Sequence, residues 1–212
     1  MVSCLNSGLR WRSRALPSTW SSGVGRQARD GVPSCVITRR RSPPWICSST
    51  IGFELLYAFI IIRLDRRDLV WINVTTNPTA EWIAHQIREA FPWDEAPRYL
   101  IRDRDRIYGN VVMRRIRTMG IRDKPIAPAS PWQNGFAERL IGSIRRECVD
   151  HIVVWGEGHL RRILRDYARY YNNIRTHRSL DKDAPAFRSV QRIGTITSYP
   201  ILGGLHHRYA RI

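Results

Sequence analysis

The sequence predicts an α/β fold, a mixed sheet flanked by helices, and three observations support this. Between residues 51 and 185, short apolar segments rich in β-branched residues alternate with segments of helical periodicity. The composition, with 43% hydrophobic and 25% charged residues, is that of an ordinary globular protein. The longest apolar run, residues 55–62, is about half the ~20 residues that a membrane-spanning helix needs. We therefore expect a buried core and no membrane partner.

Changes in composition divide the 212-residue chain into three parts. Residues 1–50 hold eight arginines, ten serines and one acidic residue without sustained periodicity, which predicts a basic, disordered arm. Residues 51–185 carry the alternating pattern and form the predicted domain. Residues 186–212 return to Gly, Ser and Arg with little periodicity, and we expect a loosely packed tail.

The domain begins with a predicted hairpin and a helix. Apolar strands at 53–64 and 69–75 flank a polar turn that contains two aspartates and two arginines. Residues 78–92 place their apolar side chains at helical spacing, with proline in the first turn and Asn77 as the N-cap.

Two short strands and one helix follow. A buried strand is predicted at 98–102 and another at 121–127. Between them lies a helix at 110–119, which Gly120 closes because glycine readily adopts the left-handed conformation of a helix C-terminus.

Two long helices complete the predicted domain. Ser130 and Gln133 have the spacing of a capping box, so a helix is expected from Ser130 to about residue 151. A last helix at 159–176 keeps its apolar residues on one side, which indicates that this side packs against the sheet.

The charge is strongly positive and is carried almost entirely by arginine. Basic residues number 35 against 18 acidic ones, a formal charge of +17, and only Lys124 and Lys182 are lysines. The planar guanidinium group binds phosphate through two hydrogen bonds, so a nucleic acid is the first partner we predict. A merely soluble surface encoded by a GC-rich gene stays open as the alternative.

Two features predict a cytoplasmic protein. The first 20 residues contain several arginines but no uninterrupted apolar segment of the kind found in secretory signals. The four cysteines have neither metal-ligand nor disulfide-framework spacing, which indicates a reducing compartment. We expect association with the nucleoid when the protein is bound to DNA.

Two acidic residues stand at positions suited to a metal site. Asp103 directly follows the strand predicted at 98–102, and Glu138 lies two turns into the helix that starts near Ser130. A strand end and a packed helix can bring carboxylates together to bind Mg²⁺ or Mn²⁺ through oxygen, and two such ions can cleave and transfer DNA strands. The alternative is that Asp103 and Asp105 are turn residues bonded to backbone amides and Glu138 is an ordinary helix residue.

The helix with Glu138 also carries the side chains that we assign to DNA binding. Arg139, Arg145 and Arg146 lie on it, and Arg145, seven positions after Glu138, is nearly on the same side. Trp132, near the start of the helix, is the aromatic residue expected to contact substrate. A solvated basic face is the competing interpretation of the arginines.

Three motifs carry a resemblance to a known family. The first is Asp-Arg-Asp-Arg-Ile-Tyr-Gly at 103–109, and the second, at 129–147, contains Ser-Pro-Trp-Gln-Asn-Gly-Phe-Ala-Glu-Arg. The third is Tyr-Tyr-Asn-Asn-Ile-Arg-Thr-His-Arg-Ser-Leu at 170–180, followed by Ala-Pro. Over roughly 51–205 the chain resembles the integrase core of bacterial insertion-sequence transposases and retroviral-type integrases.

The resemblance implies a ribonuclease H-like fold with a five-stranded mixed sheet, and metal-dependent DNA strand transfer by an Asp, Asp, Glu triad. Asp103 would be the second acid and Glu138 the third, because the family's usual gap of about 35 positions separates them. These two would bind Mg²⁺ or Mn²⁺, and Asp105 ranks second to Asp103 because many relatives carry Gly at its position. The implied partners are transposon-end and target DNA, and a homo-oligomer stays open.

The first acid of the triad is missing from its place in the family pattern. In relatives it lies roughly ten residues upstream of Phe53, where this chain has Ser-Pro-Pro-Trp-Ile-Cys-Ser-Ser at 42–49. Between Asp30 and Glu54 the chain has no acidic residue, and Asp65 falls in a turn where the family has a structural Asp. We therefore expect a degraded first strand, weak metal binding and a displaced or frame-shifted start of the gene.

Together these observations predict a transposase integrase core that no longer catalyses strand transfer. One alternative is a non-catalytic DNA-binding protein derived from a transposase, which binds DNA or interferes with a full-length transposase. A weaker alternative is a ribonuclease H-like nuclease with a cellular function.

Overall fold

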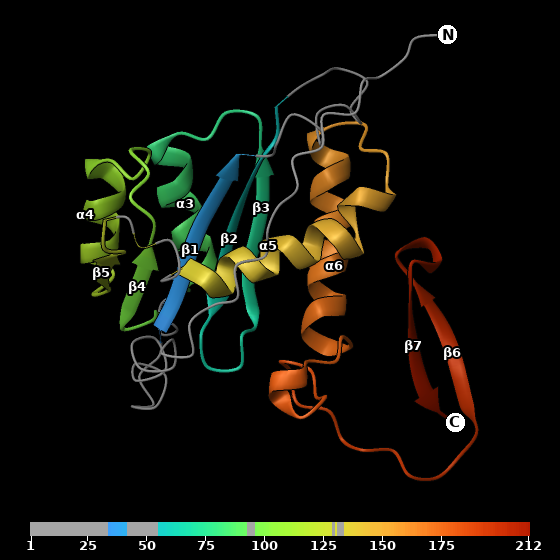
Figure 1. Cartoon of the computed structure of the whole chain (residues 1–212). Helices are drawn as coiled ribbons and strands as arrows, with labels where there is room; N and C mark the ends of the chain where they lie inside the picture. Colours follow the sequence, from blue (N-terminus) through green and yellow to red (C-terminus); the bar gives the residue numbers. More distant parts are fainter. Residues whose placement is uncertain (1–33, 42–54, 93–95, 129, 131–133) are drawn as a thin grey trace, which may run out of the picture.

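A mixed sheet forms the centre of the structure. The structure is a computed structural model, and it describes residues 34–41, 55–92, 96–128, 130 and 134–212. The strands are β1 (Ser34–Arg41), β2 (Tyr57–Arg63), β3 (Leu69–Thr75), β4 (Tyr99–Arg102) and β5 (Arg122–Pro125). They are ordered β3-β2-β1-β4-β5 (Figure 1). β1 is antiparallel to β2 and parallel to β4, so it joins the hairpin half of the sheet to the parallel half.

Helices cover both faces of this sheet, and the α/β class is confirmed. The helices are α3 (Ala80–Ala90), α4 (Asn110–Thr118), α5 (Gly135–Glu147) and α6 (Glu157–Asn173), with short 3-10 turns η3 (Val149–His151) and η4 (Arg178–Leu180). One hydrophobic cluster lies under α3 and α4 and a second under α5 and α6. Within the described ranges, every helix is too short or too polar to cross a membrane.

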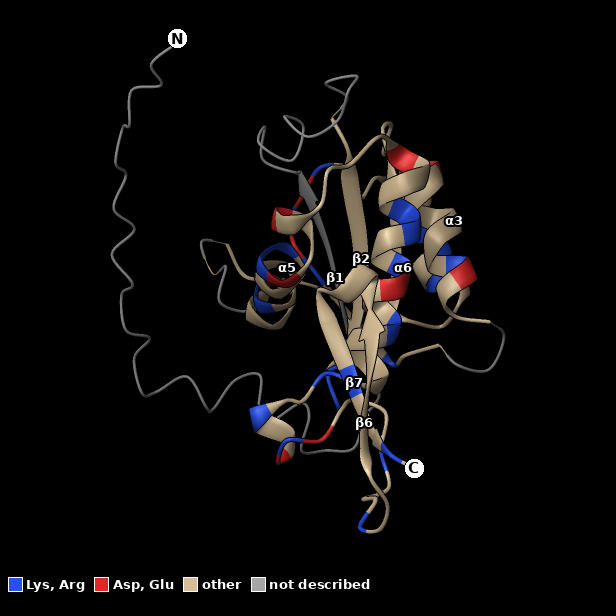
Figure 2. Cartoon of the chain, turned by 90° about the vertical axis from the view of Figure 1, so that its right-hand side faces the viewer, with Lys and Arg blue, Asp and Glu red and all other residues tan. Residues whose placement is uncertain are grey.

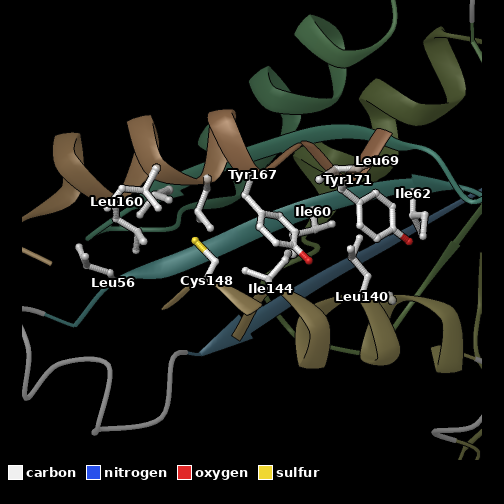
Figure 3. Close-up of a cluster of buried hydrophobic side chains, with 14 of the residues drawn as sticks. Leu56, Ile60, Ile62, Leu69, Leu140, Ile144, Cys148, Leu160, Tyr167 and Tyr171 are labelled. Carbon is white, nitrogen blue, oxygen red and sulfur yellow. The ribbon is translucent and has the colours of Figure 1, made fainter. Parts of the chain in front are cut away.

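Strand β2 contributes to both hydrophobic clusters. Phe59 and Ile61 pack under α3 and α4, while Ile60 and Ile62 pack under α5 and α6. All four side chains are buried, because successive residues of a central strand point to opposite covered faces. Figure 3 shows Ile60 and Ile62 facing the side chains that α5 and α6 direct toward the sheet.

Strand β1 lies in the segment that we expected to be a disordered arm, and that expectation is wrong for residues 34–41. The strand pairs with β2 from Cys35 to Arg41. Its run Cys-Val-Ile-Thr at 35–38 is short and β-branched, so it suits a strand, but the surrounding arginines and serines masked the pattern. The rest of the predicted arm, including 42–49 where we placed the family's first strand, lies outside the described residues.

The start of α3 differs from the prediction, whereas the end of α4 agrees with it. Thr79, not Asn77, is the N-cap: its Oγ1 accepts a hydrogen bond from the Trp82 N–H at 3.1 Å. Gly120 follows α4 with φ 71°, a left-handed conformation that costs glycine little.

Helix α5 starts later than the predicted capping box at Ser130. It begins at Gly135, and the Ser130 hydroxyl donates to the carbonyl of Pro128 at 3.2 Å instead of capping a helix. Residues 131–133 lie outside the described part of the chain. At its other end, α5 stops at Glu147 because Cys148 leaves the helical region with φ −140° and ψ −67°.

The predicted loosely packed tail contains a β-hairpin over residues 196–211, which we did not predict, and most residues of its strands are exposed. Strands β6 (Ile196–Ile201) and β7 (His206–Arg211) pair antiparallel, joined by η5 (Leu202–Gly204). Gly203 and Gly204 have positive φ values, which glycine tolerates and which allow the tight connection.

Asn172 of α6 closes part of the open edge of the sheet at β3. Its Oδ1 accepts from the Leu69 N–H and its Nδ2 donates to the Leu69 carbonyl, each at 2.9 Å. Farther along the same edge, Arg161 Nη2 donates to the Val74 carbonyl at 3.0 Å. Unpaired edge groups invite pairing with another chain, so these contacts protect β3.

Replacing Asn172 by alanine is expected to lower the free energy of unfolding by about 2 kcal/mol, because two backbone groups of Leu69 lose their partner. Asn173→Ala is the matched control: Asn173 is exposed, and its replacement should change the free energy by less than about 0.5 kcal/mol. Urea unfolding measures both variants. Equal losses at 172 and 173 would contradict the edge-closing role of Asn172.

Candidate functional site

Asp103 is the first residue after β4 and is half-buried. Its Oδ1 accepts a hydrogen bond from the Asp105 N–H at 3.4 Å, and Asp105 Oδ1 accepts from the Ile107 N–H at 3.1 Å. These are the turn contacts of the alternative interpretation. Asp103 therefore lies at a strand end, which suits a ligand-binding residue, and also stabilises the turn that follows.

Arg102 holds the backbone at Asp103 in place. Its Nε and Nη2 donate to the two carboxylate oxygens of Asp123 at 2.8 and 3.0 Å, and its Nη1 donates to the Asp103 carbonyl at 3.1 Å. The guanidinium also lies 5.1 Å from the centre of the Tyr108 ring. Our sequence analysis missed this role, because the pairing of Arg102 with Asp123 depends on the alignment of β4 with β5.

Glu138 lies in the first turn of α5 and is half-buried. Phe136 lies on the opposite flank of the helix, because two residues turn an α-helix by about 200°. The Phe136 flank faces the turn between β2 and β3, since the Arg67 guanidinium of that turn lies 4.8 Å from the Phe136 ring centre. The Glu138 flank therefore faces the other end of the sheet.

The direction of the strands shows which acidic residue belongs to that end. β2 runs against β1 and β4, so the β2–β3 turn lies where β1 and β4 begin, and Asp103 lies where β4 ends. Ile101, two residues before Asp103, belongs to the cluster that contains Ala137 of α5. The structure thus directs Asp103 and Glu138 to the same end of one sheet face and places Asp65, in the turn, at the other end.

The strand beside β4 carries no third acid. Pairing of β1 with β4 ends at Ile37 and Arg102, so position 38 of β1 is the next neighbour of Asp103. That position is a threonine, and β1 as a whole reads Ser-Cys-Val-Ile-Thr-Arg-Arg-Arg. Over the described residues, no three His, Cys, Asp or Glu side chains gather into a metal-binding group.

Arg146 of α5 is directed toward the Glu138 flank by a glycine. A Cβ on Gly142 would lie only 2.9 Å from Arg146 Nη1, so the guanidinium covers Gly142. Positions 138, 142 and 146 are four residues apart and follow one line along the helix. Because Gly142 has no side chain, Arg146 can reach back toward Glu138. We did not identify Gly142 from the sequence, although its spacing from Glu138 is a usable signal.

The other residues assigned to DNA differ in their surroundings. Arg139 is exposed on α5. The pKa of Arg67 lies below its usual value, mainly because Arg67 is partly buried and secondly because of the positive charge of Arg139. Arg145 is ion-paired with Asp150, its Nε 3.2 Å from Oδ1, in a solvent-accessible pair that contributes little to stability. Trp132 lies outside the described residues.

Comparisons with known proteins show what parts of this chain are similar to. A family model described as the integrase core domain matches residues 119–185, which include Glu138 but not Asp103. An uncharacterized 39.2 kDa protein of insertion element IS476 from Xanthomonas euvesicatoria is 34% identical over 67 residues, covering 32% of this chain and 19% of that protein. The match thus spans about a fifth of the relative.

The fold has a counterpart among solved structures. A chain in the cryoEM structure of the simian T-cell lymphotropic virus intasome, in complex with the PP2A regulatory subunit B56 gamma, superposes with a TM-score of 0.55. The identity is 13%, and the alignment covers 84% of this chain and 66% of that chain. At this identity the likeness shows the fold alone. Together, the family match, the insertion-element relative and the shared fold support a transposase or integrase core in this protein.

Proposed function

We propose that this protein is a DNA-binding remnant of an insertion-sequence transposase, with a ribonuclease H-like core and an incomplete catalytic set. The observation that carries the proposal is the central strand β1. It lies beside β4, where a carboxylate would stand next to Asp103, and it contains no acidic residue. Asp103 and Glu138 are then the two retained members of an Asp, Asp, Glu triad.

The sequence of β1 suits its place in the sheet poorly. Central strands covered on both faces are normally apolar throughout, whereas β1 ends in three consecutive arginines. This conflict between local sequence and position supports a displaced or frame-shifted start of the gene.

Within the part of the chain that the structure describes, the carboxylates do not fit a two-ion site. Two ions about 3.5–4 Å apart need a bridging oxygen ligand, and Asp103 and Glu138 alone leave the pair short of carboxylates. The proposed activity is therefore DNA binding without strand transfer. In that role the protein would occupy DNA that a full-length transposase also uses.

The outer face of α5 is the proposed surface for duplex DNA. Arg139 and Arg146 are exposed there, and Arg146 lies beside the Glu138 flank. Helix-borne guanidinium groups on a chain of formal charge +17 favour contacts with phosphate over contacts with base edges.

Salt-dependent duplex binding tests the proposal. If about six phosphates are contacted, the logarithm of the association constant should fall against that of the salt concentration with a slope of roughly −5. The double variant Arg139→Gln/Arg146→Gln should make this slope shallower by about 1.8, because each lost phosphate contact removes about 0.9. Fluorescence anisotropy of a labelled duplex gives both values.

The matched control replaces two exposed arginines of α4, Arg114 and Arg117, by glutamine. It removes the same charge from a helix that covers the other face of the sheet and should leave the slope nearly unchanged. A slope near zero for the unmodified chain would refute DNA binding, and equal changes in both double variants would refute the assignment to α5.

A further inference from the structure

The C-terminal hairpin is fixed to the core at only one end. Near its turn, the His206 ring stacks on Tyr170 with 4.2 Å between ring centres, and His206 Nε2 lies 2.7 Å from the Glu147 carbonyl oxygen. At the open end, Ile196 and Tyr209 are largely exposed. Figure 1 shows the hairpin standing beside α6, with the chain returning to it from below.

A cleft of about 1110 Å³ lies between this open end, the last turns of α6 and the segment 180–191. Its lining is strongly basic, with six cationic side chains against two aspartates. The cationic residues are Arg66, Arg169, Lys182, Arg188, Arg208 and Arg211. Figure 2 shows the basic residues of the hairpin and of the preceding segment in blue.

Only part of this positive charge is balanced within the protein. Arg66 Nη2 lies 2.8 Å and Arg188 Nε 3.6 Å from the carboxylate of Asp183, and both arginines also donate to backbone carbonyls. For Lys182 and Arg208, in contrast, the described part of the chain offers no ion-pair partner within 4.0 Å. The cleft therefore presents surplus positive charge to a ligand.

Exposed aromatic side chains accompany this charge. Phe187 is 82% exposed and Tyr209 is 68% exposed, and both line the cleft. Large apolar groups held this open to water indicate a binding surface. Aromatic rings beside a basic groove are the combination that binds single strands, because bases stack on the rings while cations contact the phosphates.

We propose that this cleft binds single-stranded DNA, separately from the duplex surface on α5. Lys182 and Arg208 would contact the phosphodiester backbone, and Phe187 and Tyr209 would stack with bases. The choice of DNA as the nucleic acid rests on the proposed function, whereas the existence of the site rests on the cleft itself.

The test measures binding of the full chain to labelled oligothymidylate and to a labelled duplex. Phe187→Ala/Tyr209→Ala should weaken single-strand binding by about 30-fold or more, since two stacked bases are lost, and change duplex binding less than about twofold. Lys182→Gln/Arg208→Gln should also weaken single-strand binding and make its salt slope shallower by about 1.4. All four side chains are exposed, and circular dichroism melting checks that each variant stays folded.

Two further variants separate this inference from the proposed function. Arg114→Gln/Arg117→Gln should leave single-strand binding intact, and Arg139→Gln/Arg146→Gln should weaken duplex binding only. Unchanged single-strand binding in both cleft variants, or equal losses of single-strand and duplex binding, would overturn the cleft assignment while DNA binding on α5 stands. If the unmodified chain binds neither the single strand nor the duplex, both proposals are overturned.

Discussion

Thr38→Asp is expected to give this protein a much larger response to divalent metal than the unmodified chain, which we expect to bind metal weakly. Position 38 is paired with Ile60 and is the next position of β1 alongside Asp103, so the substitution adds a third carboxylate to the end of the sheet that Glu138 faces. Carboxylate oxygens are the ligands that Mg²⁺ and Mn²⁺ prefer.

The size of the metal response follows from the binding of Mn²⁺ to the folded state and not to the unfolded state. At a Mn²⁺ concentration about 100 times Kd, the free energy of unfolding rises by about 2.7 kcal/mol. For a chain of this length, that raises Tm by roughly 5–10 °C. Thermal melting with and without Mn²⁺ measures the effect, and metal-dependent nicking of transposon-end DNA is the second readout.

Two variants control for the added carboxylate. Thr38→Asn has nearly the same shape without the charge and should show no metal response. Adding Glu138→Gln to Thr38→Asp should remove the response again. A folded Thr38→Asp variant that is indifferent to Mn²⁺ would contradict the alignment of position 38 with Asp103. Strand transfer by the unmodified chain would overturn the remnant proposal.

The contrast between β2 and β1 shows which strands the sequence could predict. β2 is an apolar run covered on both faces, and its pattern alone located it within a few residues. β1 has four strand-forming residues followed by three arginines, so its place depends on pairing with β2 and β4 and not on its own pattern. The hairpin β6–β7 was missed for a similar reason, because its strands are mostly exposed and lack a buried face.

For the candidate site, too, some features could be predicted from the sequence and others depend on the folded structure. The prediction of Asp103 and Glu138 as site residues rests on a strand end and a family resemblance. The flank of α5 that faces Asp103 could not be read from the sequence, because it depends on the contact of Arg67 with Phe136. The packing of Arg146 over Gly142 depends likewise on a side-chain conformation.

Arg175→Met is expected to produce the largest loss of stability. Arg175 Nε and Nη2 donate to the two carboxylate oxygens of Glu147 at 2.8 and 2.6 Å, and the Tyr167 hydroxyl donates to the same carboxylate at 2.9 Å. The pair joins the end of α5 to the segment after α6. Breaking a fully buried pair costs about 3–5 kcal/mol, and because about a quarter of each side chain is exposed we expect about 2–3 kcal/mol.

The same pair makes stability depend on pH. Burial alone would raise the pKa of Glu147, but the hydrogen bonds and charge of Arg175 outweigh it, so the pKa lies below its usual value. A carboxyl with a lowered pKa in the folded state stabilises the protein above its unfolded pKa of about 4.3, and this stabilisation is lost as pH falls through the folded value. Urea unfolding from pH 6 down to acid should show this loss, and Glu147→Gln should reduce it.

The double variant separates the pair from simple loss of a side chain. Arg175→Met leaves the Glu147 carboxylate partly buried without its main partner, whereas Glu147→Gln/Arg175→Met removes the charge as well. The double variant should therefore be more stable than Arg175→Met alone, which is the reverse of additive losses. Arg178→Met, at an exposed position of η4, is the matched control and should stay within about 0.5 kcal/mol of the unmodified chain. Additive losses in the double variant would show that Glu147 and Arg175 stabilise the fold independently and that the ion pair does not lock α5 to the end of α6.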